Sequence, residues 1–63
     1  MEPDAKTIES IKELRAEADG ARHLASSLDD SASIADLFAY AMALEAQADF
    51  WELGLRRRRA EAA

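Results

Sequence analysis

Side chains that could bind a metal ion are few in this chain of 63 residues. It has no cysteine and a single histidine, His23, which has Asp19 four residues before it. Metal sites in helical bundles bridged by carboxylates need Glu-x-x-His motifs on facing helices, and no such motif occurs. His23 also falls among the polar positions of its segment. We therefore interpret His23 as a surface histidine and expect no metal site and no cofactor.

Serine hydroxyls are the remaining candidates for nucleophilic chemistry. The serines are Ser10, Ser26, Ser27, Ser31 and Ser33. None of them lies in a glycine-flanked turn of the kind that presents a catalytic serine, and His23 is the one available base. A chain this short also cannot build walls around a catalytic cleft. We therefore expect no catalytic residue and no enzymatic activity.

Acidic side chains give the chain most of its chemical character. Thirteen acidic residues against eight basic ones leave a formal net charge of −5. Glu9, Glu13 and Glu17 recur every four residues, which places them on one ridge of a helix. Most ridges of this kind are simply solvated. One hypothesis gives this ridge a role, namely that the protein is a small acidic regulator, an antitoxin or a nucleic-acid mimic, that binds a basic partner.

Four consecutive arginines, Arg56, Arg57, Arg58 and Arg59, form a basic tail. Such a run can neutralise phosphates. However, residues 1–55 carry twelve acids and four bases, a charge of −8, whereas the last eight residues carry +3. The acidic body repels a nucleic acid over a Debye length, which argues against direct nucleic-acid binding. The tail fits the negative end of a helix dipole, and contact with an acidic protein, RNA or anionic lipid is the alternative.

The composition predicts helices as the elements that position these side chains. Valine is absent, while alanine, leucine, glutamate and arginine are frequent. A first helix is expected over about residues 4–27, because its apolar residues recur at steps of three and four. These residues are Ile8, Ile11, Leu14, Ala18, Ala21, Leu24, Ala25 and Leu28. Their spacing predicts one buried stripe, with a solvated face opposite.

A short polar turn is expected over about residues 28–33, followed by a second helix over about residues 33–58. Serine and aspartate in the turn supply caps: Ser33 with Asp36 is one option, and Asp30 or Ser31 is another. A turn this short makes the helices antiparallel neighbours within a single domain, residues 1–63. The stripe of the second helix is Ile34, Leu37, Ala41, Leu44, Ala48, Trp51 and Leu55.

The face of the second helix that points away from this stripe is apolar as well. Only two of its nine positions are charged, namely Asp36 and Asp49, whereas Met42, Phe50 and Leu53 are large and apolar. A helix that is apolar nearly all round is normally buried all round, and one partner helix cannot achieve that. We therefore predict a protein interface formed by Phe38, Met42, Phe50, Trp51 and Leu53.

Self-association is the simplest way to bury that face. Small domains without disulfides or metals usually gain stability from oligomers. A dimer of hairpins makes a four-helix bundle, with the second helix central and the first peripheral. Alanines would let the two helices of one hairpin approach closely, and the larger side chains would fill the space between subunits. These alanines are Ala18, Ala21, Ala25, Ala41 and Ala48.

The apolar stretch of residues 32–55 does not predict a transmembrane segment. It contains Asp36, Glu45, Asp49 and Glu52, and four acidic side chains in hydrocarbon exclude a spanning helix. The first residues are acidic and polar, with no apolar segment behind them, which argues against a secretory signal. We therefore expect a cytoplasmic protein.

One sequence pattern resembles a known group of proteins. It consists of Ala18-x-x-x-Arg22-x-Leu24-Ala25, a short Asp/Ser turn, and Leu37-x-x-x-Ala41-x-x-Leu44-Glu45-x-x-Ala48. Over about residues 14–52 it resembles short uncharacterised bacterial α-helical hairpin proteins. The resemblance implies the helical-hairpin fold and a bacterial origin, and it brings no activity. Phe50, Trp51 and the basic tail lie outside the pattern.

Together these features favour a non-enzymatic, structural or adaptor role. The leading hypothesis is a small helical protein that self-associates, or docks on a larger protein partner, through the apolar faces of its second helix. The acidic regulator acting through Glu9, Glu13 and Glu17 is the alternative. A third possibility is an accessory subunit of a larger complex, on which the second helix docks directly.

Overall fold

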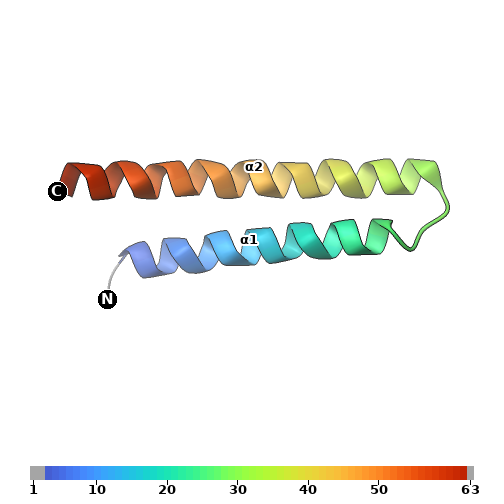
Figure 1. The fold of residues 1–63 in the computed structure, drawn as a ribbon, viewed down its shortest axis with the longest axis horizontal. Helices are drawn as coiled ribbons and strands as arrows, with labels where there is room; N and C mark the ends of the chain where they lie inside the picture. The colour runs from blue at the N-terminus through green and yellow to red at the C-terminus, as the bar shows by residue number, and fades with distance from the viewer. Residues whose placement is uncertain (1–2, 63) are drawn as a thin grey trace.

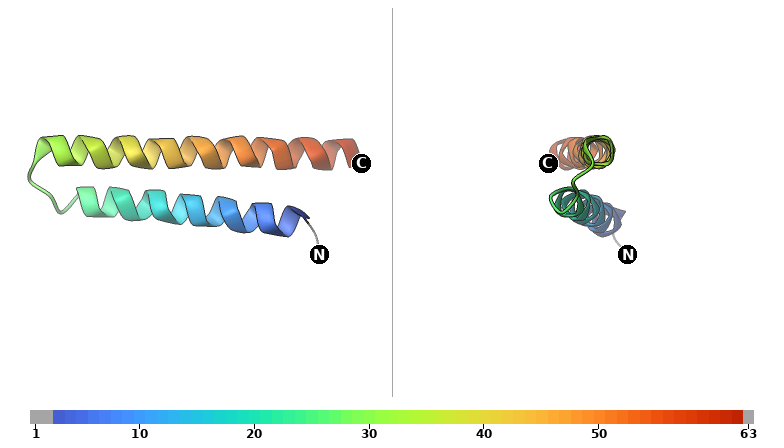
Figure 2. Two further views of the ribbon diagram at one scale, coloured as in Figure 1. Left: turned by 180° about the vertical axis from the view of Figure 1, so that it is seen from behind. Right: turned by 90° about the vertical axis from the view of Figure 1, so that its right-hand side faces the viewer.

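Two α-helices joined by a short turn make up the fold in a computed structural model, which describes residues 3–62 (Figure 1). α1 spans Pro3–Ala25 and α2 spans Ser31–Ala62. The helices lie antiparallel and side by side, in a molecule of 50 × 18 × 10 Å (Figure 2). The predicted all-α hairpin is confirmed. The predicted domain also includes residues 1, 2 and 63, which lie outside the described residues.

α1 begins at Pro3 and ends at Ala25, two residues earlier than expected. Proline fits the first helical turn, where its missing N–H costs no hydrogen bond. At the other end, the Ser26 hydroxyl donates to the carbonyl of His23 at 2.6 Å, and the Ser27 hydroxyl donates to that of Leu24 at 2.8 Å. Because these hydroxyls satisfy carbonyls of the last turn, the helix ends without a left-handed glycine.

Asp30 caps the N-terminus of α2, which is why the helix begins at Ser31 rather than Ser33. The Asp30 carboxylate accepts hydrogen bonds from the Ser33 backbone N–H at 3.0 Å and from the Ser33 hydroxyl at 2.7 Å. These donors lower the pKa of Asp30 below its ordinary value of 3.8, the hydroxyl having the larger effect. Of the residues that the sequence offers as caps, Asp30 is therefore the one that caps α2.

α2 continues to Ala62, four residues beyond the expected end at residue 58. The residues that follow Arg58 are good helix formers, and Gly54 does not interrupt the helix. The basic tail, Arg56–Arg59, is consequently part of α2 rather than an extension beyond it. Arg58 lies opposite the first turn of α1, where its guanidinium is 3.5 Å from the Asp4 carboxylate.

Alanines make up most of the buried contact between the helices. All five alanines predicted to lie there are buried, and Ala41 and Ala48 have no exposed surface. One cluster, near the turn, contains Ala18, Ala21, Ala41 and Leu44; the other, toward the termini, contains Ile11, Ala48 and Leu55. Small side chains let two helices pack at short range, so this core is thin.

Leu24 and Trp51 of the predicted stripes are exposed, and Thr7, which lies outside those stripes, is buried. Leu24 is exposed, because Ala21 and Ala25 face α2 and Leu24 lies about 100° around the helix from Ala25. Thr7 is buried although it is polar, and its hydroxyl accepts a hydrogen bond from Arg58 at 3.5 Å. A threonine with a partner can thus occupy an end of the contact between helices.

Enlarging one buried alanine tests how closely the helices pack. Ala48→Leu should lower the free energy of unfolding by about 1–3 kcal/mol, because extra methyl groups force the helices apart. The matched control is Ala16→Leu on the exposed face of α1, which should change it by less than about 0.5 kcal/mol. Urea denaturation followed by circular dichroism measures both. Equal stability of the two variants would contradict the packing described here.

Removing the Asp30 cap should destabilise α2 in a pH-dependent way. The folded pKa lies below 3.8, so the stabilisation is complete above pH 3.8 and is lost as the pH falls through the folded pKa. Asp30→Ala should lower the melting temperature at pH 7 by about 5 °C. The difference from the unmodified protein should shrink at more acidic pH. Asp30→Asn, which keeps the acceptor oxygen, should retain most of the stability at pH 7; a loss as large as that of alanine would refute the capping role.

Candidate functional site

The side of α2 that faces away from α1 carries a second apolar stripe. Ala41, Ala48 and Leu55 recur every seven residues on the buried side. Ala39, Ala46 and Leu53 each lie two residues before one of these buried residues. They therefore point about 200° around the helix, away from α1. Together with their neighbours they form what we call the outer seam. The outer seam consists of Ala35, Ala39, Met42, Ala43, Ala46, Phe50 and Leu53.

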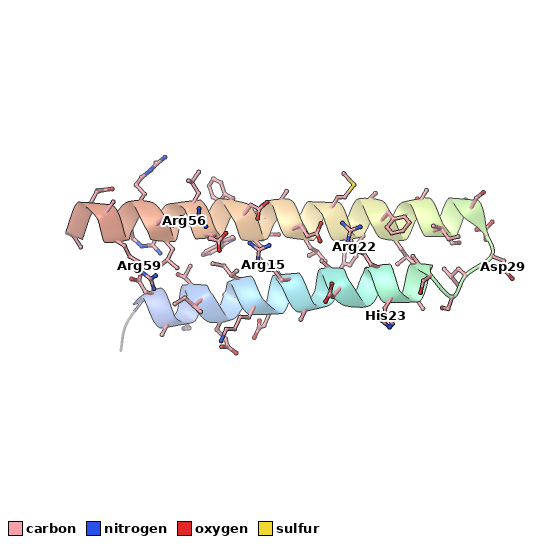
Figure 3. All side chains as sticks on the ribbon, viewed as in Figure 1. Arg15, Arg22, His23, Asp29, Arg56 and Arg59 are labelled. Carbon is pink, nitrogen blue, oxygen red and sulfur yellow. The ribbon has the colours of Figure 1, made fainter. Side chains whose placement is uncertain are left out.

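Every residue of the outer seam is exposed to solvent. Its three large side chains are all more than half accessible, with 75% of Phe50, 62% of Met42 and 56% of Leu53 exposed. Figure 3 shows side chains that project from α2 on the side opposite α1. Contiguous exposed apolar surface of this kind usually marks a site of interaction. Three of the five residues predicted to form an interface therefore share one face.

Phe38 and Trp51 lie elsewhere, on opposite flanks of α2. Phe38 is 40% exposed and lies beneath the guanidinium of Arg22, which is 5.7 Å from the ring centroid. Trp51 is 42% exposed and borders a shallow depression between the helices. That depression is also lined by Ser10, Glu13, Leu14, Glu17 and Gln47. Phe38 thus lies against a side chain of α1, whereas Trp51 borders both α1 and a second depression that Phe50 and Leu53 of the outer seam also line.

Ion pairs between the helices line the Phe38 flank. The Arg22 guanidinium contacts the Glu45 carboxylate through two hydrogen bonds, of 2.6 and 3.3 Å. Arg15 contacts Asp49 at 3.0 Å and Glu52 at 3.2 Å. Figure 3 shows Arg15 and Arg22 on the side of α1 that faces α2.

The ion pair of Arg22 changes the pKa of both partners. Its hydrogen bonds to Glu45 lower the pKa of that carboxyl below 4.5 and raise the pKa of the guanidinium. We did not predict these ion pairs from the sequence, although charged residues on either side of an apolar stripe are the signal for them.

On the opposite flank of α2, where Trp51 lies, Tyr40 contacts one carboxylate of the acidic ridge. The Tyr40 hydroxyl donates a short hydrogen bond to the Glu17 carboxylate, and this bond raises the pKa of Tyr40. Glu9 and Glu13 are exposed on α1. The ridge is therefore present as predicted, but one of its three carboxylates is already bound within the hairpin. An acidic regulatory role stays a prediction.

The four arginines of the basic tail point to different surroundings. Arg58 contacts Asp4, and Arg56 lies 3.7 Å from Glu52, one turn earlier. Arg57 lies at the end of the outer seam and forms no ion pair with the described residues. Because the arginines surround the helix, they do not make one continuous basic surface.

His23 is exposed on α1 (Figure 3). Among residues 3–62, no cluster of three histidine, aspartate or glutamate side chains could hold a metal ion. Neither helix, over its described residues, is long and apolar enough to span a membrane.

Comparison of the chain with protein-family models, curated proteins and solved structures gave no match. The resemblance to short bacterial α-helical hairpin proteins thus stays a prediction. The outer seam of α2 is an exposed apolar surface of the hairpin.

Proposed function

We propose that the protein is a non-enzymatic assembly element that self-associates through the outer seam of α2. The observation that carries this proposal is the exposure of Met42, Phe50 and Leu53 on one face, on the side of α2 opposite α1. Water is an unfavourable environment for such a continuous apolar stripe. Packing against another apolar helix removes it from water at roughly 25 cal/mol per Å².

The hairpin's own core gives a second reason for self-association. It is built mainly from alanine, and no large side chain of the described residues is completely buried. A chain of this size buries too little surface to be very stable alone. Association through the outer seam would add Met42, Phe50 and Leu53 to a shared core. The assembly is then a four-helix bundle with α2 central and α1 peripheral.

The polarity of α1 supports this arrangement. The face of α1 opposite α2 carries Glu9, Lys12, Ala16 and His23, all of which are exposed. A helix with a solvated outer face belongs at the periphery of a bundle, whereas a helix with two apolar faces belongs at its centre. A structural or adaptor role follows, in which the paired hairpins form one scaffold.

Replacing two seam residues by glutamate tests this proposal. Met42→Glu with Phe50→Glu should weaken self-association by at least about 100-fold, because charges would have to enter the shared core. Light scattering across a dilution series measures the mass, and circular dichroism on the same samples measures helix content and melting temperature. The unmodified protein should have twice the chain mass and lose stability on dilution.

The matched control adds the same two charges on the outer face of α1. Ala5→Glu with Ala16→Glu places them at exposed positions, so this variant should associate like the unmodified protein. If the protein and the seam variant have the same mass and melting temperature at every concentration, the proposed function is wrong.

A further inference from the structure

Opposite charges bound the two ends of the outer seam. Asp36 lies on the first turns of α2 and Arg57 on its last turns, and both side chains are exposed. Neither forms an ion pair with the described residues. Asp36 lies ten residues before Ala46, and Arg57 lies eleven residues after it. The charges are therefore nearly symmetric about the middle of the seam.

We propose that two copies of this chain pair antiparallel through their outer seams, with a two-fold axis beside Ala46. The inference rests on the proposed function and specifies the orientation and register of the pairing. A two-fold contact uses the same surface on both copies, so every contact between two different residues occurs twice, once on each side of the axis. Asp36 of each copy then lies beside Arg57 of the other, which forms two equivalent ion pairs.

The same register matches the sizes of the apolar side chains. With Ala46 opposite Ala46, Met42 of one copy lies opposite Phe50 of the other, and Ala39 lies opposite Leu53. At the Ala39 level a small residue thus faces a large one, which is the arrangement that interdigitating helices need. The pairing also brings a thioether to an aromatic ring, a favourable contact. Alanine at the axis lets the two helices come close.

A parallel pairing in register would be poorer in every respect. It places Asp36 beside Asp36 and Arg57 beside Arg57, and like charges side by side are unfavourable. It sets Phe50 against Phe50 and Ala39 against Ala39, which crowds one level and leaves space at another. It also aligns the two helix dipoles in the same direction. The charges at the seam ends therefore select the antiparallel partner.

Gly54 leaves space beside Arg57 for the Asp36 side chain of the second copy. A depression on α2 is lined by Phe50, Trp51, Leu53, Gly54, Arg57 and Arg58. A Cβ atom at Gly54 would meet the Arg58 side chain at 3.8 Å, an ordinary contact, so the glycine keeps this surface open without being required by the hairpin itself. In the antiparallel register, the turn of α2 that carries Asp36 reaches this end of the seam.

Charge exchange tests the pairing. Asp36→Arg and Arg57→Asp should each weaken the dimer about 10-fold at low salt, because each replaces two attractive pairs by two repulsive ones. The double variant Asp36→Arg with Arg57→Asp should return to within about threefold of the unmodified affinity. Sedimentation across a dilution series measures the affinities, and helix content by circular dichroism shows that each variant is folded. Single variants without effect, or a double variant as weak as the singles, would overturn the pairing.

A distance measurement determines the orientation independently. The chain has no cysteine, so Ala32→Cys carries a single nitroxide label at an exposed site near the start of α2. The antiparallel pairing predicts about 43 Å between the two backbone positions, at 1.5 Å per residue from the axis. A parallel pairing predicts about 10–20 Å. Pulsed electron resonance on the dimer distinguishes the two.

These outcomes separate the inference from the proposed function. If the seam variant Met42→Glu with Phe50→Glu dissociates the dimer but the labels lie within 20 Å, the antiparallel pairing is wrong and the assembly role stands. If the folded protein is monomeric at every concentration, both the antiparallel pairing and the proposed function fail.

Discussion

The structure depends on how closely two helices can approach along a line of methyl groups. Ala18 and Ala21 of α1 pack with Ala41 of α2, and Ala48 continues the line toward the termini. Ile11, Leu44 and Leu55 also pack in this contact, but no large side chain of the described residues is completely buried. The aromatic residues and methionine must therefore lie on the flanks and on the outer side of α2. Because alanines occupy most of the contact between the helices, the core of the hairpin is thin and its large apolar side chains lie on the surface.

α2 has two apolar sides, and the neighbouring charges determine which of them faces α1. Glu45 and Glu52 flank the alanine side and meet Arg22 and Arg15 of α1. Turning α2 by half a rotation would separate these ion pairs and press Phe50 and Met42 against α1, where Ala41 and Ala48 now pack. Exposed ion pairs add little to stability, but several of them on one flank fix the rotation of a helix. The same constraint that closes the hairpin thus directs the outer seam away from it.

Periodicity and residue size were enough to predict the two helices, their antiparallel order and the buried alanines. The outward position of Met42, Phe50 and Leu53 also followed from spacing alone. The helix ends did not, because several serines and aspartates compete as caps and only the local geometry selects Asp30. Spacing alone also did not show that Phe38 and Trp51 lie on the flanks of α2, beside α1. Residues at the border between two faces can turn either way, and the choice depends on neighbours such as Arg22 that belong to the other helix.

In the proposed pairing, the charge distribution also explains why assembly would stop at two hairpins. A two-fold contact buries the outer seam of both copies, so no outer seam stays exposed to bind a third hairpin. What remains exposed is the outer face of α1, with Glu9 and Glu13 on both sides of the bundle, in a chain of net charge −5. Like charge on the outside opposes stacking of bundles upon one another. The acidic ridge then acts as the boundary of the assembly, which gives the charge of α1 a structural purpose that requires no basic partner.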